Sequence, residues 1–345
     1  MALIFADSFD HYDNAYLQSK WTSVSNFGNS LQGLVLNNTQ ARTGPQCGQF
    51  TGLGAFVTIE NSSTWTVGGA FNWQAYGGGV TIQHLGTIQV QWLINADGTI
   101  SVFGGPSGFN PGALLGTTDP SVAITLGRYY YVECMFVVNK TGGSVILRIN
   151  GQVVLSVSGD TSPNGDNVGD AFSIYGPGGS ALVFVDDVYV TDGNPVLNGF
   201  LGDVAIGVIY SASAGDYTQW TPLSGSNWSE VNNNPPLGDA SYVWSVAPSS
   251  GPYPIDTYYF QTVNPNRNVI AIQTNILARK SDTGNRALSL VTRYGGVDSV
   301  ADSSGRYVNE TYIDYRNCFD VNPLTTDAWT PAVCNATQWG YQLID

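Results

Sequence analysis

The sequence predicts an all-β protein, and three observations carry that prediction. Helices draw on Glu and Lys, yet the 345-residue chain holds only four glutamates and three lysines. Gly contributes 41 residues and the aromatic residues 12%, which is typical of turns between strands and of β cores. Apolar and polar residues alternate along several segments, as they do in half-buried strands.

The clearest strands form a three-stranded meander. Residues 129–138 alternate, and one face carries Tyr130, Val132, Cys134, Phe136 and Val138. Two further alternating runs follow at 145–149 and 153–157. Asn150-Gly151 separates them, and this dipeptide favours a two-residue hairpin turn because both positions need positive φ.

Other strands are expected on both sides of this meander. Asp97-Gly98 indicates a hairpin between residues 90–94 and 100–103, and residues 181–190 form a further strand. No segment has the pattern of a helix longer than a turn or two.

The length predicts about two domains. The strand pattern stops at Asp192-Gly193-Asn194-Pro195, which are turn residues. We therefore expect a first β domain over residues 1–195 and a smaller, β-sandwich-like domain over 196–345 that serves assembly or attachment. In the second part we expect strands at 204–210, 269–278 and 309–319, with 269–278 as the best candidate for a core strand.

The charges exclude several functions. The chain has 12 Lys+Arg against 26 Asp+Glu, a formal net charge of -14, and only 11% charged residues. Without clustered Lys/Arg we expect no nucleic-acid partner, and an anionic membrane surface would repel the chain. No apolar run approaches the length of about 18 residues that a membrane span needs. The N-terminus has no basic lead before a very short apolar run, so we expect synthesis in the cytoplasm without a signal peptide.

Three segments of the first 195 residues resemble the laminin-G-like, concanavalin-A-type jelly roll. They are GRYYYVE at 127–133, SVILRING at 144–151 and VDDVYV at 185–190. In that family a WYYVE-like strand precedes a hairpin that ends in Asn-Gly, and an IDDVYV-like strand closes the fold. The resemblance implies a jelly-roll sandwich of two antiparallel sheets for the first domain.

A second resemblance spans most of the chain. FADSFDHY at 5–12, followed by Lys20-Trp21, is similar to the start of structural proteins of tailed bacteriophages. GDYTQWTP at 215–222, Asn227-Trp228 and Tyr242-Val243 resemble the second half of the same proteins. The resemblance implies a non-enzymatic virion component whose partners are other virion proteins and copies of itself. We favour a tail-associated fibre or tip component that contacts the host surface, with a capsid decoration or cement protein as the alternative.

The residues offer no catalytic set. A retaining glycosidase needs two carboxyls about 5–5.5 Å apart, but no two glutamates lie near each other in the sequence, and the adjacent Asp186 and Asp187 should point to opposite faces of a strand. We expect one of these two aspartates to hydrogen-bond a loop at the sandwich edge. His11 and His84 are the only histidines, and no G-x-S-x-G motif is present. We therefore expect no enzyme.

Two kinds of binding site stay open. The loop at 160–170 offers oxygen ligands for calcium in Asp160, Asn164, Asp166 and Asp170; the alternative is a solvated acidic turn, and we expect no other cofactor. A lectin-like module that binds a host surface glycan is a further alternative function, with candidate stacking residues Trp73, Tyr76 and Trp92. Aromatic residues at this density also fill a β core.

Overall fold

The computed structural model describes residues 2–21, 33–52, 54–105, 112–178, 181–193, 199–246, 251–302 and 305–344. These residues form two compact units. The first unit consists of residues 1–10 and 20–207, and the second of residues 11–19 and 208–345. The second unit thus starts later than residue 196 and includes a segment from near the N-terminus.

The first unit contains an eight-stranded antiparallel sheet. Its order is β12-β11-β10-β5-β14-β3-β2, and β1 also pairs with β14. The strands are β1 (Leu3–Asp7), β2 (Leu34–Asn37), β3 (Cys47–Phe50), β5 (Thr64–Trp73), β10 (Tyr129–Val137), β11 (Gly143–Ile149), β12 (Gln152–Gly159) and β14 (Val183–Asp192).

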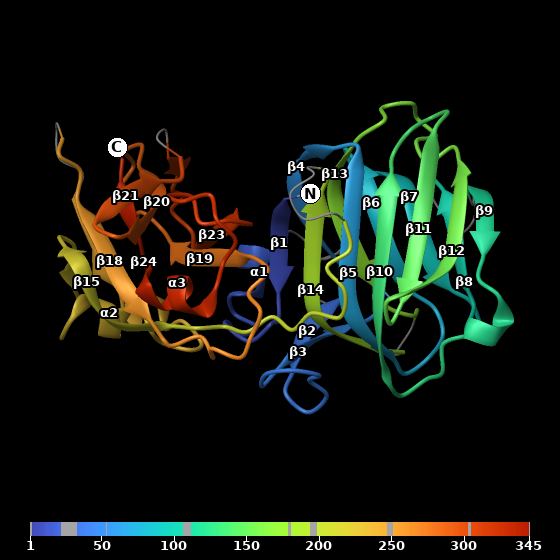
Figure 1. Ribbon diagram of the computed structural model, residues 1–345, viewed down its shortest axis with the longest axis horizontal. Coiled ribbons are helices and arrows are strands. Elements are labelled where there is room, and N and C mark those ends of the chain that lie inside the picture. The colour runs from blue at the N-terminus through green and yellow to red at the C-terminus, as the bar shows by residue number, and fades with distance from the viewer. Residues whose placement is uncertain are drawn as a thin grey trace. The chain divides into compact units, whose positions relative to one another are not determined.

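A six-stranded sheet forms the second layer of this unit (Figure 1), in the order β4-β13-β6-β7-β8-β9. Its strands are β4 (Ala55–Ser62), β6 (Gly79–His84), β7 (Thr87–Ile94), β8 (Ile100–Gly104), β9 (Ala113–Thr117) and β13 (Gly169–Tyr175). Aromatic rings join the two layers, with Phe71 of β5 5.6 Å from Trp92 of β7. The predicted all-β sandwich is therefore confirmed.

The predicted meander and hairpin are present. β10 pairs with β11 and β11 with β12, and the turn residues Asn150 and Gly151 have φ values of 50° and 80°. β7 pairs with β8, with Ile94 opposite Ile100. The predicted inner face of β10 is buried as expected, because it packs between the sheets.

The second unit is built on a six-stranded sheet in the order β15-β18-β24-β20-β21, with β22 also pairing with β20. The ribbon β19–β23 packs over it around Leu290, Trp329 and Trp339. The strands are β15 (Ser211–Thr218), β16 (Thr221–Pro222), β17 (Val243–Trp244), β18 (Ile255–Phe260), β19 (Ile272–Ala278), β20 (Ala287–Tyr294), β21 (Val297–Val300), β22 (Arg306–Tyr307), β23 (Ile313–Phe319) and β24 (Gln338–Leu343).

Two strand predictions for this part of the chain are wrong. Residues 204–210 form no strand, because backbone N–H groups between 201 and 206 donate to side chains of the first unit. Residues 269–278 do not supply the best core strand, since β19 is only partly buried while most of β20 is buried.

Helices in the described residues are short. They are α1 (Leu17–Lys20), α2 (Asn227–Glu230), α3 (Pro331–Ala336), and the 3₁₀ turns η1 (Pro120–Val122) and η3 (Gly238–Ala240). None of the helices seen here is long and apolar enough to cross a membrane.

Candidate functional site

The outer face of the six-stranded sheet carries a row of uncharged side chains across five neighbouring strands. In order across the sheet, strand pairing aligns Phe56, Ser173, Thr81, Gln91 and Phe103. The residues that alternate with them along β4, β13, β6 and β7 are buried between the two sheets. Because successive side chains of a strand point to opposite faces, this row lies on the face away from the core. Within it Phe56, Ser173 and Phe103 are partly exposed, whereas Thr81 and Gln91 are buried at 2% and 1% exposed.

Hydrogen bonds fix the middle of this row. The Oγ atoms of Ser173 and Thr81 lie 2.5 Å apart. The side-chain amide of Gln83 donates to both hydroxyls, at 2.9 Å to Ser173 and 3.0 Å to Thr81. Side chains that are already ordered lose little further entropy when a ligand binds.

An aromatic ring lies beside the row. The Tyr175 hydroxyl donates to Oε1 of Gln91 at 3.0 Å, and Nε2 of Gln91 donates to the carbonyl of Gly105 at 2.7 Å. Tyr175 is in β13 and Gln91 is in β7, so the phenol side chain spans the intervening strand β6. There it lies opposite Gly79, which has no side chain. The side chain of Tyr175 is partly exposed.

The polar surface continues toward the other edge of the sheet. Ser101 and Thr117 share a hydroxyl hydrogen bond of 2.8 Å. The side-chain amide of Asn95 donates to Ser101 at 2.8 Å and to Thr99 at 2.9 Å. We call the row, Gln83, Tyr175 and these four residues together the polar face.

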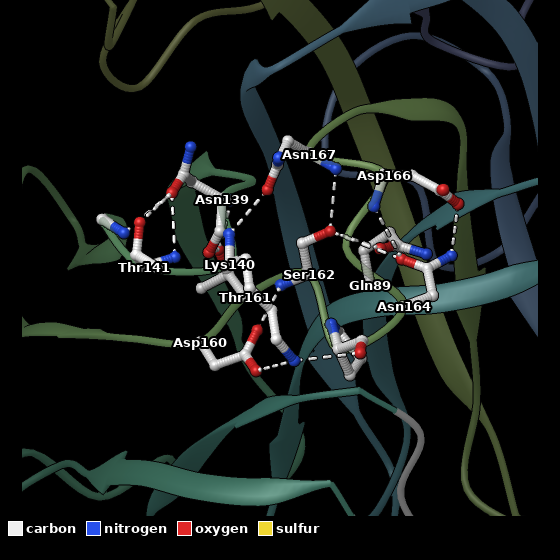
Figure 2. Close-up of polar contacts among 12 residues, drawn as sticks. Gln89, Asn139, Lys140, Thr141, Asp160, Thr161, Ser162, Asn164, Asp166 and Asn167 are labelled. Carbon is white, nitrogen blue, oxygen red and sulfur yellow. Dashed lines mark hydrogen bonds and ion pairs between the residues drawn. The ribbon is translucent and has the colours of Figure 1, made fainter.

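The residues predicted to bind calcium make hydrogen bonds within the protein. Figure 2 shows the carboxylate of Asp160 with Nζ of Lys140, at 2.6 Å; it also accepts from the backbone N–H of Ser162. Nδ2 of Asn164 donates to Asp166 at 2.5 Å. The loop is thus held together by its own polar groups and by one lysine.

Asp170, the fourth predicted ligand, lies on β13. Its carboxylate accepts from the backbone N–H of Leu85 at 2.9 Å and lies 3.5 Å from Nδ1 of His84. His84 also lies 3.8 Å from Asp166. Among the described residues, no group of three or more His, Cys, Asp or Glu side chains could hold a metal ion. The geometry therefore gives the calcium prediction no assembled set of ligands.

Two of the three predicted stacking residues are core residues instead. Trp73 and Trp92 are each 1% exposed, and both pack against Phe71 in the core. They cannot present a ring face to a sugar, because the alternation that points Gln91 outward points Trp92 inward. Tyr76 is 36% exposed, and its hydroxyl donates to the carbonyl of Ile124.

Asp186 and Asp187 do not point to opposite faces. Asp187 adopts a φ of 51° within a bulge of β14 against β5, and both carboxylates therefore contact the same loop. Asp186 accepts from the backbone N–H groups of Arg42 and Thr43. Asp187 pairs with the Arg42 guanidinium at 2.9 Å and accepts from the Thr43 hydroxyl. The expected loop anchor is present, but it uses both aspartates.

Burial controls the ionisation of these carboxyls. It raises the pKa of Asp186 to about 7, and the neighbouring charge of Asp187 adds to the effect. Burial also raises the pKa of Asp187, and that of the nearby Asp10 to about 6. Asp186 and Asp187 are both 0% exposed, so neither can reach a ligand in solution.

The residues of the polar face were not predicted from the sequence, although one signal was available. Gln89 and Gln91 alternate with Val90 and Trp92 along β7. Such a pattern places two amides on the outer face of a sheet whose inner face is apolar. The strand order, which decides what lies beside those amides, could not be read from the pattern.

Comparisons with known proteins do not place the chain in a family. No family model matches the sequence, and no curated protein matches it. Among solved structures, the galectin LEC-6 of Caenorhabditis elegans is 15% identical, with 48% of this chain and 99% of that chain covered and a TM-score of 0.30. Domain 4 of AbnA, a GH43 extracellular arabinanase from Geobacillus stearothermophilus, in complex with arabinotriose, is 14% identical, with 56% and 93% covered and a TM-score of 0.36. At these scores neither likeness carries a functional argument.

Proposed function

We propose that this chain is a non-enzymatic protein that binds carbohydrate on the polar face of its six-stranded sheet. The observation that supports the proposal is the partly exposed group of Ser173, Gln83 and Tyr175, which hydrogen bonds to the buried side chains of Thr81 and Gln91 hold in place. Sugars present hydroxyls that both donate and accept, and Ser, Thr, Asn and Gln side chains do the same. The apolar side of a sugar ring packs on an aromatic ring, which supplies contact area without charge.

A glycan-binding assay with the full chain tests the proposal. The chain is applied to an array of bacterial and plant oligosaccharides, and hits are titrated by calorimetry. Tyr175→Ala should weaken binding to a hit roughly tenfold, about 1.4 kcal/mol, because the ring and its hydrogen bond to Gln91 are removed. Tyr175→Phe keeps the ring and should lose less.

Tyr307→Ala is the matched control, since Tyr307 is 73% exposed on the second unit. It should leave affinity unchanged. If the wild-type chain binds no glycan, or if Tyr175→Ala binds as tightly as the wild type at an unchanged unfolding midpoint, the proposal is wrong.

The proposal includes no catalysis. A glycosidase places two carboxyls on either side of a sugar, whereas Asp186 and Asp187 are buried and bonded to the loop at Arg42 and Thr43. Bound oligosaccharides should therefore be recovered intact, which mass spectrometry of the supernatant checks.

The proposal also places the chain on the particle of a tailed bacteriophage, where a tail fibre or tip would use such a face against the host surface. A capsid decoration protein is the alternative. The sequence resemblance supports this part. Large apolar side chains also lie exposed on a chain with few lysines, among them Trp244 at 47% and Val246 at 72%, as suits packing against other chains.

Mass spectrometry of purified virions, followed by labelled antibodies in electron microscopy, tests the location. Absence from virions would contradict it.

A further inference from the structure

We propose that the polar face selects neutral glycans, meaning oligosaccharides without carboxylate, sulfate or phosphate groups, and rejects their acidic counterparts. This inference rests on the proposed carbohydrate binding and adds the class of ligand. The distribution of charged residues on and around the six-stranded sheet supports this selectivity.

The strands of this sheet contain no cation. Across β4, β13, β6, β7, β8 and β9 there is no lysine and no arginine, while Glu60 and Asp170 supply two carboxylates. The connecting segment 106–111 has no charged residue in its sequence. An acidic sugar placed on this face therefore meets no opposite charge from the sheet itself.

The cations in the loops next to the sheet already have partners. The ammonium group of Lys140 pairs with Asp160 at 2.6 Å and donates to the carbonyl of Pro163 at 3.0 Å. The guanidinium of Arg128 lies over the ring of Tyr130, 4.8 Å from its centroid, and donates to the Tyr130 hydroxyl. Recruiting either cation would break these contacts.

His84 does not supply the missing charge. It lies at the end of β6 between two carboxylates, 3.8 Å from Asp166 and 3.5 Å from Asp170. If it is protonated, its charge is opposed by both aspartates, so the local balance stays negative. The excess of acidic residues over the whole chain acts in the same direction.

The physical consequence is a difference in desolvation. A carboxylate or sulfate gives up strong hydration on binding, and it recovers that loss only from cations or several charge-assisted hydrogen bonds. Neutral hydroxyls exchange hydrogen bonds with water for similar bonds to the partly exposed Ser173 and Gln83. The polar face should therefore favour the neutral member of any matched pair.

A paired array tests this selectivity. Each neutral oligosaccharide is spotted beside its sialylated, sulfated or uronic-acid counterpart, and the full chain is applied at 50 mM and 500 mM NaCl. We expect at least tenfold weaker binding to each acidic member at 50 mM. We also expect the gap to narrow at 500 mM, because salt screens the repulsion.

A charge substitution sharpens the test. Thr58 is exposed on β4, opposite Ala171 of β13, and Thr58→Lys adds a cation to the outer face. Thr58→Lys should raise the affinity for acidic oligosaccharides several-fold. Thr58→Gln introduces a neutral side chain of similar length to lysine and should not raise it. Equal or tighter binding of acidic glycans by the wild type overturns the selectivity but leaves carbohydrate binding standing. Binding to no glycan overturns both.

Discussion

At the scale of single residues, the buried acidic cluster around Arg42 is the most unusual feature. Asp186 and Asp187 are both inaccessible to solvent, and among the described residues one guanidinium, that of Arg42, pairs with them. Nearby, Asp7 receives the indole N–H of Trp21 at 2.7 Å and lies 3.3 Å from Nζ of Lys20. Burial of more than one carboxyl beside so few cations disfavours the charged form, and pH should therefore control the stability of this unit.

The sign of that pH effect follows from the direction of the shift. The pKa of Asp186 is raised in the folded chain to about 7, above its unfolded value. Its stabilising contribution is therefore fully present below the unfolded pKa of about 3.9 and is lost as the pH rises through about 7. Between pH 5 and 8 the first unit should lose on the order of 2 kcal/mol. Chemical denaturation at several pH values measures this.

Asp186→Asn should flatten this dependence, because the amide keeps an oxygen acceptor for the loop and cannot ionise. Glu60→Gln, an exposed change in the same unit, serves as the control and should keep the wild-type slope. An unchanged slope in Asp186→Asn would show that burial of this carboxyl does not govern the pH response.

At the scale of elements, residues 199–206 form a strap that lies on the first unit without being a strand. The Gly202 N–H donates to Oε1 of Glu133 at 2.7 Å, and the Ile206 N–H donates to Asp187 at 2.7 Å. Tyr189 joins the first of these contacts, since its hydroxyl donates to the same Glu133 oxygen. Buried side chains thus provide the partners that a neighbouring strand would otherwise supply.

Glu133→Ala should release the strap locally. Removing the carboxylate leaves the Gly202 N–H and the Tyr189 hydroxyl without their acceptor, at a cost of roughly 1–3 kcal/mol. Hydrogen exchange measured by mass spectrometry should show the 199–207 peptide protected in the wild type and exchanging faster in Glu133→Ala. Glu133→Gln, which keeps an acceptor oxygen, should stay close to the wild type. Fast exchange of this peptide in the wild type would contradict the description of the strap.

At the scale of the whole molecule, each unit has its own sheets and core, but the chain does not divide at a single point. Residues 11–19 belong to the second unit. Within it, the ring of Tyr16 meets that of Tyr312 edge-on at 5.8 Å. Tyr16 also lies close to Gly238, where a Cβ atom would come within 2.2 Å of the Tyr16 hydroxyl.

Tyr16→Ala should therefore loosen the second unit although the residue lies near the N-terminus. Loss of the aromatic contact, worth about 1 kcal/mol, should speed hydrogen exchange in the peptides that contain Tyr312 and Gly238. Peptides of the first unit should be unaffected, and Tyr307→Ala again provides an exposed-tyrosine control. Unchanged exchange around Tyr312 would show that segment 11–19 does not stabilise this unit.

The sequence by itself determined the fold class and the local elements that depend on nearest neighbours. Alternation along β10, β11 and β12 and the Asn150-Gly151 turn identified the meander, because side-chain period and turn conformation are local properties. The same information could not separate core from surface for Trp73 and Trp92, nor could it show that Asp186 and Asp187 contact the same loop.

Only the tertiary structure decided the candidate site. Ser173 lies 92 residues from Thr81 in the sequence and becomes a neighbour of Thr81 and Gln91 because β13 pairs with β6 in the sheet. The bulge at Asp187 and the strap also could not be predicted from the sequence, because both depend on side chains contributed by distant segments. Strand order is set by packing of the whole core, and a pattern read along one strand contains no record of it.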